Sequence, residues 1–213
     1  MFELPLFPLN TVLFPGMPLP LHVFEERYRE MIQFCLDDKR PFGVVLIRSG
    51  VAEGGPVADP YEVGCVAEIV EVERLEDGRL LLMTVGTERF RILSLNHDRA
   101  YLMGTMEDFP FAAETEQALA QAANRLLPLV AEYLRILADT GHVEFDSDQM
   151  PTDPEDLIFL AAAAIQVDAE QKQAFLENDK ATSVLNELTK IYRQELKYMR
   201  LMPKEDQGIF SLN

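Results

Sequence analysis

The stretch GCVAEIVEVERLEDGRLLLMTVGTERFRILSL, residues 64–95, contains two apolar runs separated by Asp77-Gly78. An Asp-Gly pair is typical of a two-residue β-hairpin turn, because that turn requires a positive φ at its central residues. We therefore expect one strand over residues 64–75 and a second over residues 79–95. The stretch predicts a long β-hairpin.

The residues around this hairpin predict further strands and a single helix. Prolines hold the first stretch extended, because each fixes its own φ and biases the residue before it away from helix. The helix is expected over residues 25–37, where apolar residues recur at helical spacing, and residues 49–60, rich in Gly and Pro, predict a loop. Further strands are expected at residues 4–9, 10–14, 19–24, 42–47 and 101–106. Short strands with Gly/Pro turns indicate a small, partly closed β-barrel.

After residue 110 the apolar residues follow helical spacing, which predicts a helical bundle. Pro128 lies inside the first of its helices and predicts a kink or a break there. Asp153 and Asp168 are placed as helix N-caps. We expect helices at residues 116–138, 153–166, from 168 onward, and 182–201. The predicted fold is therefore α+β: a β-barrel domain at 1–110, a helical bundle at 111–203 and a C-terminal tail at 204–213.

The composition restricts the partners. The 213 residues include 36 Asp and Glu but only 19 Lys and Arg, a net charge of -17 at pH 7. Such a body repels the phosphates of nucleic acids, so we expect no DNA partner and disfavour RNA. The apolar run at 157–167 is too short to span a bilayer, and the N-terminus lacks the basic start of a signal peptide. The two cysteines are too few for a disulfide framework and are expected to be reduced thiols. The sequence therefore predicts a cytoplasmic protein with no membrane contact.

The sequence has none of the common motifs of catalysis or cofactor binding. It contains no Gly-Lys dipeptide and therefore no P-loop, no Gly-x-Gly-x-x-Gly, no Cys-x-x-Cys and no His-Glu-x-x-His. A nucleophilic Cys65 with His22 as its base is an alternative, but Cys65 reads better as a small hydrophobic residue in a strand. We expect no enzymatic activity, no cofactor and no metal site. The acidic residues between 146 and 156 leave weak cation binding open.

Met and Phe residues near predicted turns are the one positive functional signal. Burial is often incomplete at turns, and flexible Met side chains suit promiscuous apolar contact. An exposed Arg27 or Tyr28 could also contact a ligand. The alternative is that most of these residues fill the cores of the barrel and the bundle. The candidate contacts for a peptide or protein are Phe14, Met17, Leu19, Phe24, Arg27, Tyr28, Phe109, Phe111, Met199 and Met202.

An ordered series of short motifs resembles the N-terminal domain of Lon protease. The series begins with LPLFPL at 4–9, VLFPG at 12–16 and FEERY at 24–28. It continues through FGV at 42–44, VGCVA at 63–67, DGR at 77–79, Arg89-Phe90, Asp153-Pro154 and residues 172–177. The resemblance extends over about residues 3–200.

The resemblance implies a PUA-like β pseudobarrel with one helix, followed by an α-helical bundle. It also implies a role, because this domain of Lon protease engages substrate polypeptides and aids assembly. The ATPase and peptidase modules follow it in the full enzyme, and no residue here matches their catalytic dyad. The chain is thus expected to be a stand-alone, non-enzymatic LON substrate-binding domain protein with protein or unfolded-polypeptide partners.

Two points stay open at this stage. Weak self-association into a homo-oligomer is compatible with the sequence. A PUA-like module that binds a small molecule or RNA is the alternative function, and it rests on analogy of fold alone.

Overall fold

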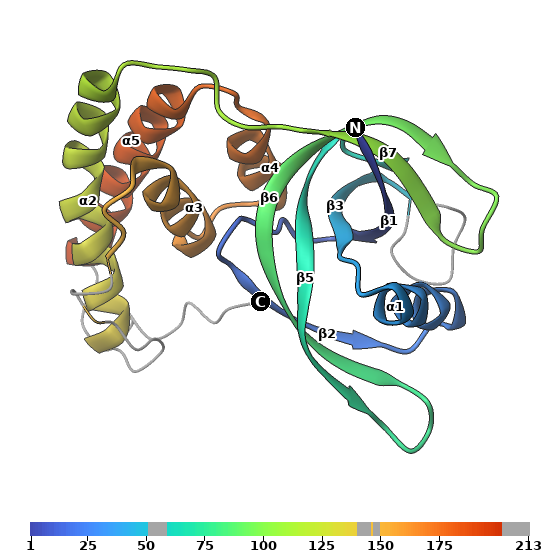
Figure 1. The fold of residues 1–213 in the computed structure, drawn as a ribbon. Coiled ribbons are helices and arrows are strands. Elements are labelled where there is room, and N and C mark those ends of the chain that lie inside the picture. Colours follow the sequence, from blue (N-terminus) through green and yellow to red (C-terminus); the bar gives the residue numbers. More distant parts are fainter. Residues whose placement is uncertain (51–58, 140–145, 147–149, 202–213) are drawn as a thin grey trace. The chain divides into compact units, whose positions relative to one another are not determined.

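The computed structural model describes residues 1–50, 59–139, 146 and 150–201 (Figure 1). The expected tail at 204–213 lies outside these residues, as does most of the loop expected at 49–60. Contacts divide the chain into two units. The first comprises Met1–Pro110 with Val167–Asp179, and the second comprises Phe111–Gln166 with Lys180–Asn213.

The first unit is built on a curved, mainly antiparallel sheet (Figure 1). Its strands are β1 (Phe2–Leu9), β2 (Pro18–Val23), β3 (Phe42–Ser49), β4 (Asp59–Pro60), β5 (Val63–Arg74), β6 (Leu80–Asn96) and β7 (Leu102–Asp108). Five strands follow the order β1-β7-β6-β5-β3, and parallel pairing of β1 with β3 closes them into a barrel. This confirms the β-rich first part of the predicted α+β fold.

The central hairpin forms as predicted. Gly78 adopts a φ of +83°, and β5 and β6 pair from Val63–Arg91 to Arg74–Leu80. The end of this hairpin near Gly78 extends beyond the closed barrel, where β2 lies beside β6 (Figure 1). There β6 is the middle strand of three.

Residues 10–14, which the structure describes, form no strand, so that expectation was wrong. The segment instead turns against β6: Gly16 N donates to Gly86 O at 2.8 Å, and Gly86 N donates to Met17 O at 3.0 Å. A Cβ on Gly86 would lie 2.3 Å from Phe14 O, so only glycine permits this approach. The turn satisfies backbone groups that a strand would have paired in the sheet.

Helix α1 (Glu26–Asp38) buries the face predicted from its spacing. Met31 and Ile32 are fully buried, and burying each stabilises the fold by about 1.5–3 kcal/mol. Tyr28 meets Phe7 of β1 edge to face at 4.3 Å between ring centroids. The helix thereby joins the main apolar core of the barrel.

Helix α4 (Ala169–Glu177) belongs to the first unit, whereas the sequence placed all of 111–203 in the helical bundle. The reason is a set of long-range hydrogen bonds. Gln173 Nε2 donates to Val63 O at 2.9 Å, and Arg89 Nη1 donates to Leu176 O and Asn178 O at 2.9 Å each. These bonds hold α4 to β5 and β6.

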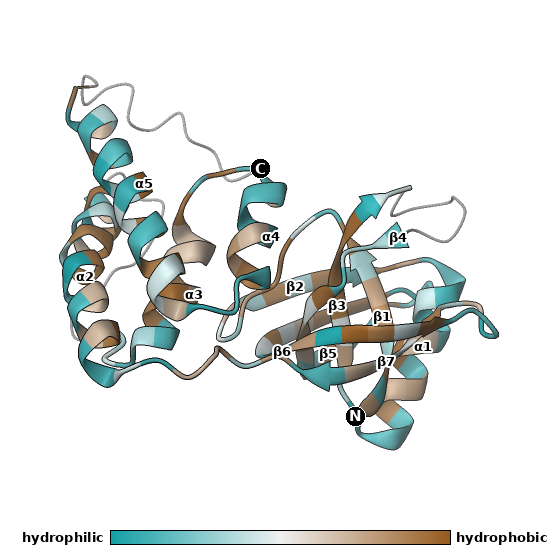
Figure 2. Ribbon diagram, turned by 90° about the horizontal axis from the view of Figure 1, so that it is seen from above, coloured by the Kyte–Doolittle hydropathy of each residue, from teal (hydrophilic) through white to brown (hydrophobic). Residues whose placement is uncertain are grey.

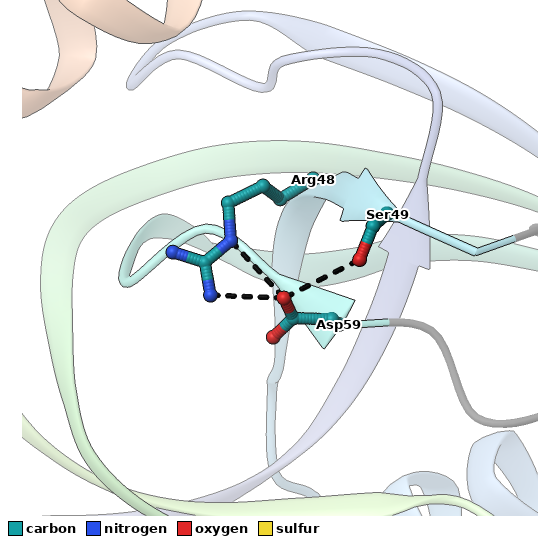
Figure 3. A network of polar contacts seen from close by, with 3 residues as sticks. All are labelled: Arg48, Ser49 and Asp59. Carbon is teal, nitrogen blue, oxygen red and sulfur yellow. Dashed lines mark hydrogen bonds and ion pairs between the residues drawn. The ribbon is translucent and has the colours of Figure 1, made fainter.

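Arg48 and Asp59 join the adjacent ends of β3 and β4 (Figure 3). Arg48 Nε and Nη2 donate to Asp59 Oδ2 at 3.1 and 2.9 Å, and Ser49 Oγ donates to the same oxygen at 3.4 Å. Both charged side chains are 51% exposed, so solvent screens their attraction and the pair adds little to stability.

The second unit consists of α2 (Glu116–Asp139), α3 (Pro154–Ala164) and α5 (Ala181–Leu201). Polar and apolar residues alternate along α2 and α5 as in amphipathic helices (Figure 2). Their buried faces meet where Tyr133 contacts Tyr192 edge to face at 5.2 Å. The predicted helical second half is thus observed.

Helix α2 continues through Pro128, so of the two alternatives expected there, a kink or a break, the break does not occur. An internal proline costs about 3 kcal/mol, because it removes one helical hydrogen bond and crowds the preceding turn. Burial of Leu126, Val130 and Tyr133 on either side offsets this cost. The expected caps are present: Asp153 Oδ1 accepts from Glu155 N at 2.8 Å, and Asp168 Oδ1 accepts from Gln171 N at 2.7 Å.

Candidate functional site

Half of the contact residues expected from sequence are core residues. The expectation that they are accessible was wrong for these five, which are at most 8% exposed: Phe14, Leu19, Tyr28, Phe109 and Met199. The turn that carries Phe14 folds onto β6, and Leu19 lies on the inner face of β2. These side chains therefore support the surface around them.

The other five predicted residues differ in their surroundings. Phe24 is 45% exposed and Met17 is half-buried. The Arg27 side chain is bound by Glu25, whose carboxylate accepts a hydrogen bond from Arg27 Nε at 3.0 Å. Phe111 stacks on Phe159 at 5.7 Å within the second unit. Met202 lies outside the described residues.

Cys65 and His22 do not form a nucleophile and base pair. Cys65 is fully buried, and burial raises the pKa of its thiol to about 12. His22 is on the outer face of β2, with its ring 5.8 Å from that of Phe24. A buried thiol that stays protonated is a poor nucleophile, so Cys65 is a core residue.

The main candidate site is the outer face of the three-stranded region formed by β2, β6 and β5. In this region Pro20 pairs with Met83, which pairs with Glu71 on its other side. In the next row on the same face His22 pairs with Leu81, which pairs with Glu73. Successive side chains of a strand alternate between faces, so these six share one face.

We call this face the β2–β6 groove. It has a volume of about 380 Å³ and is lined by Pro20, Leu21, His22, Glu71, Glu73, Leu81, Leu82 and Met83. Leu81 and Met83 are 38% and 37% exposed at its centre, whereas Leu80 on the opposite face is buried. The groove therefore contains an apolar strip that is accessible to solvent.

Two features extend the apolar character of this region. A register shift between Ile69 and Glu71 leaves Val70 as an extra residue of β5, and Val70 is 65% exposed. A smaller pocket of about 90 Å³ shares Leu21 and His22 with the groove and reaches Phe24. Phe24 was predicted from sequence, so one predicted residue lies beside the groove.

Leu81 and Met83 were missed by the sequence reasoning. They belong to the run LLLM at 80–83, which lacks the apolar-polar alternation of a half-buried strand. Such a run is read as a fully buried strand. The signal that could have found them is position: the run follows directly on the hairpin turn, where only a short sheet is available to cover both faces.

The groove has an acidic side. Glu71 and Glu73 are both exposed, and within the described part of the chain neither carboxylate makes an ion pair or a side-chain hydrogen bond. The nearby arginines are engaged elsewhere: Arg74 Nη2 donates to Gln33 Oε1 at 2.7 Å, and Arg79 pairs with Asp77 at 2.6 Å. Two carboxylates therefore border an apolar strip without a counter-charge.

Among the described residues, no three His, Cys, Asp or Glu side chains are grouped so that they could hold a metal ion. Of the helices whose residues are described, none combines the length and the apolar character needed to cross a bilayer.

Comparison with known proteins adds a family match. The model of the ATP-dependent protease La (LON) substrate-binding domain matches residues 3–194. Lon protease of Anaeromyxobacter dehalogenans (strain 2CP-C) and Lon protease 2 of Myxococcus xanthus are each 27% identical over 208 residues, or 97% of this chain. The match covers 25% of each relative, so the chain spans about a quarter of their length.

Two solved structures have a similar fold. The N-terminal domain of Mycobacterium avium complex Lon protease superposes with a TM-score of 0.70 at 19% identity, covering 90% of this chain and 98% of that one. The Lon N-terminal domain protein from Xanthomonas campestris superposes with a TM-score of 0.60 at 25% identity, covering 95% and 100%. Both agree with a β-rich part followed by helices.

Proposed function

Because this chain belongs to the LON substrate-binding domain family, we propose that it binds polypeptide segments in the β2–β6 groove without catalysing a reaction on them. The observation that carries the proposal is the exposure of Leu81 and Met83 at the centre of the groove. An unfolded segment exposes apolar side chains that a folded protein buries, and burying them on this strip is favourable.

The groove is suited to binding segments of varied sequence rather than one specific sequence. Its centre combines a flexible Met with a Leu, and Met side chains adapt to partners of different shape. The strip is small, so affinity in the micromolar range is expected. Weak, adaptable binding is what a protein that samples many segments requires.

The residues predicted from sequence take two roles in this proposal. Phe24 and Met17, which remain accessible, are proposed as additional contacts. Of the buried residues, Leu19 lies beneath the groove and holds it in place, because Thr84 Oγ1 donates to Leu19 O at 2.9 Å and so ties β2 to β6.

The lack of catalysis is also proposed. The matching family model describes a substrate-binding domain, and the sequence of this chain contains no P-loop and no nucleophile elbow. The free, buried Cys35 and Cys65 suit the reducing conditions of a cytoplasm, where we place the protein.

The test is a titration of a fluorescent, permanently unfolded model protein of near-neutral net charge with the full chain. Leu81→Ser combined with Met83→Ser should weaken binding at least tenfold, because it removes the apolar strip. Leu93→Ser is the matched control, since Leu93 is a 47% exposed leucine of the same strand outside the groove. The proposal fails if the unaltered chain shows no binding at high micromolar concentration, or if the double variant binds equally well.

A further inference from the structure

We infer that Glu71 and Glu73 make the β2–β6 groove select segments in which a Lys or Arg neighbours an apolar residue. This inference rests on the proposed function and names the substrate class for the same groove. Both carboxylates lie on the groove face, Glu71 in register with Met83 and Glu73 in register with Leu81. Each row of the groove therefore pairs an apolar centre with an acidic side.

The spacing suits an extended segment. Neighbouring strands lie about 4.8 Å apart, so each carboxylate is one strand away from its apolar neighbour. Residues two apart on a strand are about 6.6–6.8 Å apart on the same face, and both rows have that separation. A segment that places an apolar side chain on Leu81 or Met83 can thus extend a lysine or arginine to the carboxylate beside it.

The carboxylates are available for such a pairing. In the described part of the chain no basic side chain pairs with Glu71 or Glu73. The arginines of this part of the hairpin are used elsewhere, since Arg74 donates to Gln33 and Arg79 pairs with Asp77. Arg29 of α1, which reaches the hairpin turn, donates from Nη1 to Gly78 O at 3.4 Å. A cation from a partner would fill a position that this chain leaves open.

The net charge points to the same partner. At -17 the chain attracts cationic segments over distances up to roughly the Debye length of about 10 Å, and it repels a second copy of itself. A second copy would also bring its own pair of carboxylates to the strip. The charge therefore favours a basic and apolar polypeptide over self-association at this face.

The test uses three peptides that share one apolar core and carry Lys, Gln or Glu at the same flanking positions. Exposed ion pairs are weak, so we expect the Lys peptide to bind about three- to tenfold more tightly than the Gln peptide, and the Glu peptide to bind worst. This preference should shrink at 0.5 M salt. Titrations by fluorescence anisotropy measure all three affinities.

The decisive variant is Glu71→Gln combined with Glu73→Gln, which should abolish the preference, so that the Lys and Gln peptides bind with equal affinity. The matched control is Glu30→Gln combined with Glu187→Gln, which changes the net charge equally at exposed helix positions and should keep the preference. Thermal melting checks that all variants fold.

The outcomes separate the two proposals. If the unaltered chain binds all three peptides equally, or if the Glu71→Gln, Glu73→Gln variant keeps the preference, the inference is wrong and the proposed function stands. If the helix control loses the preference too, overall charge and not the groove is responsible, which also overturns the inference. If no peptide binds, both the inference and the proposed function fail.

Discussion

Arg89 on β6 donates a hydrogen bond from Nη1 to the carbonyl oxygen of Leu176, at 2.9 Å, across 87 residues of sequence. The same nitrogen donates to Asn178 O at 2.9 Å. The last carbonyl groups of a helix have no partner within it, so this guanidinium completes the C-terminal end of α4. Together with the bond from Gln173 to Val63 O, the two bonds of Arg89 hold α4 to the barrel strands.

Replacing Arg89 should therefore destabilise the first unit. Hydrogen bonds from a charged donor contribute about 1.5–3 kcal/mol each, and Arg89 is only 5% exposed. We expect Arg89→Ala to cost at least about 3 kcal/mol in urea unfolding and to speed hydrogen exchange in α4. Arg91→Ala is the control, because the Arg91–Glu107 pair is exposed and separated by 3.9 Å. Equal losses in the two variants would contradict this role.

Gly86→Ala tests the turn that replaces the expected strand at 10–14. The new Cβ would lie 2.3 Å from Phe14 O, a backbone atom, so the turn must move away from β6. We expect a loss of at least about 2 kcal/mol. In Gly16→Ala the new Cβ would have no atom within 4 Å, and the only strain would come from the φ of +76°. This substitution should therefore cost about 1 kcal/mol. Thermal unfolding measures both, and a reversed order would refute the argument.

The local parts of the fold could be predicted from sequence, and the long-range parts could not. The Asp77-Gly78 turn, the buried face of α1 and the Asp153 cap each depend on residues within one or two turns. The parallel pairing of β1 with β3 and the placement of α4 depend on contacts between distant residues. Nothing local distinguishes Arg89 from an ordinary surface arginine.

The candidate site was harder to predict, because exposure depends on which strands cover a face. Phe14 lies near a turn and yet is buried, since the turn folds onto β6. Leu81 lies in an apolar run and yet is exposed, since the outer face of the extended hairpin is open. Phe24 was found because it follows β2 at the edge of the groove.

The buried thiols predict a loss of stability in alkali. Burial raises the pKa of Cys35 and of Cys65 to about 12, against about 8.5 when exposed. The unfolded chain releases these protons first, so stability is full below about pH 8.5 and falls as the pH rises towards 12. Urea unfolding should lose about 2 kcal/mol per thiol between pH 8 and pH 10. Cys35→Ala with Cys65→Ala should remove that part of the loss, and an unchanged pH dependence would count against it.

Tyr192 connects two helices of the second unit through its hydroxyl. Tyr192 Oη donates to Ala161 O at 2.9 Å, and the residue is fully buried. Tyr192→Phe removes this donor, and the Ala161 carbonyl keeps its bond from Ile165 N at 3.1 Å. We therefore expect the loss of one hydrogen bond, about 0.5–1.5 kcal/mol in thermal or urea unfolding. Tyr198→Phe should change nothing measurable, because Tyr198 is 51% exposed. A neutral Tyr192→Phe would contradict the proposed contribution of this hydrogen bond.

Two substitutions of Met83 test whether apolar contact at this position determines binding in the groove. Met83→Leu keeps an apolar side chain of similar volume, so affinity for an unfolded segment should stay within about threefold. Met83→Lys should weaken it at least tenfold, because the lysine removes part of the strip and can pair with Glu71 in the same row. Met83 is 37% exposed, so both variants should melt close to the unaltered chain. If Met83→Lys binds the neutral segment as tightly as Met83→Leu does, apolar contact at this position does not determine binding.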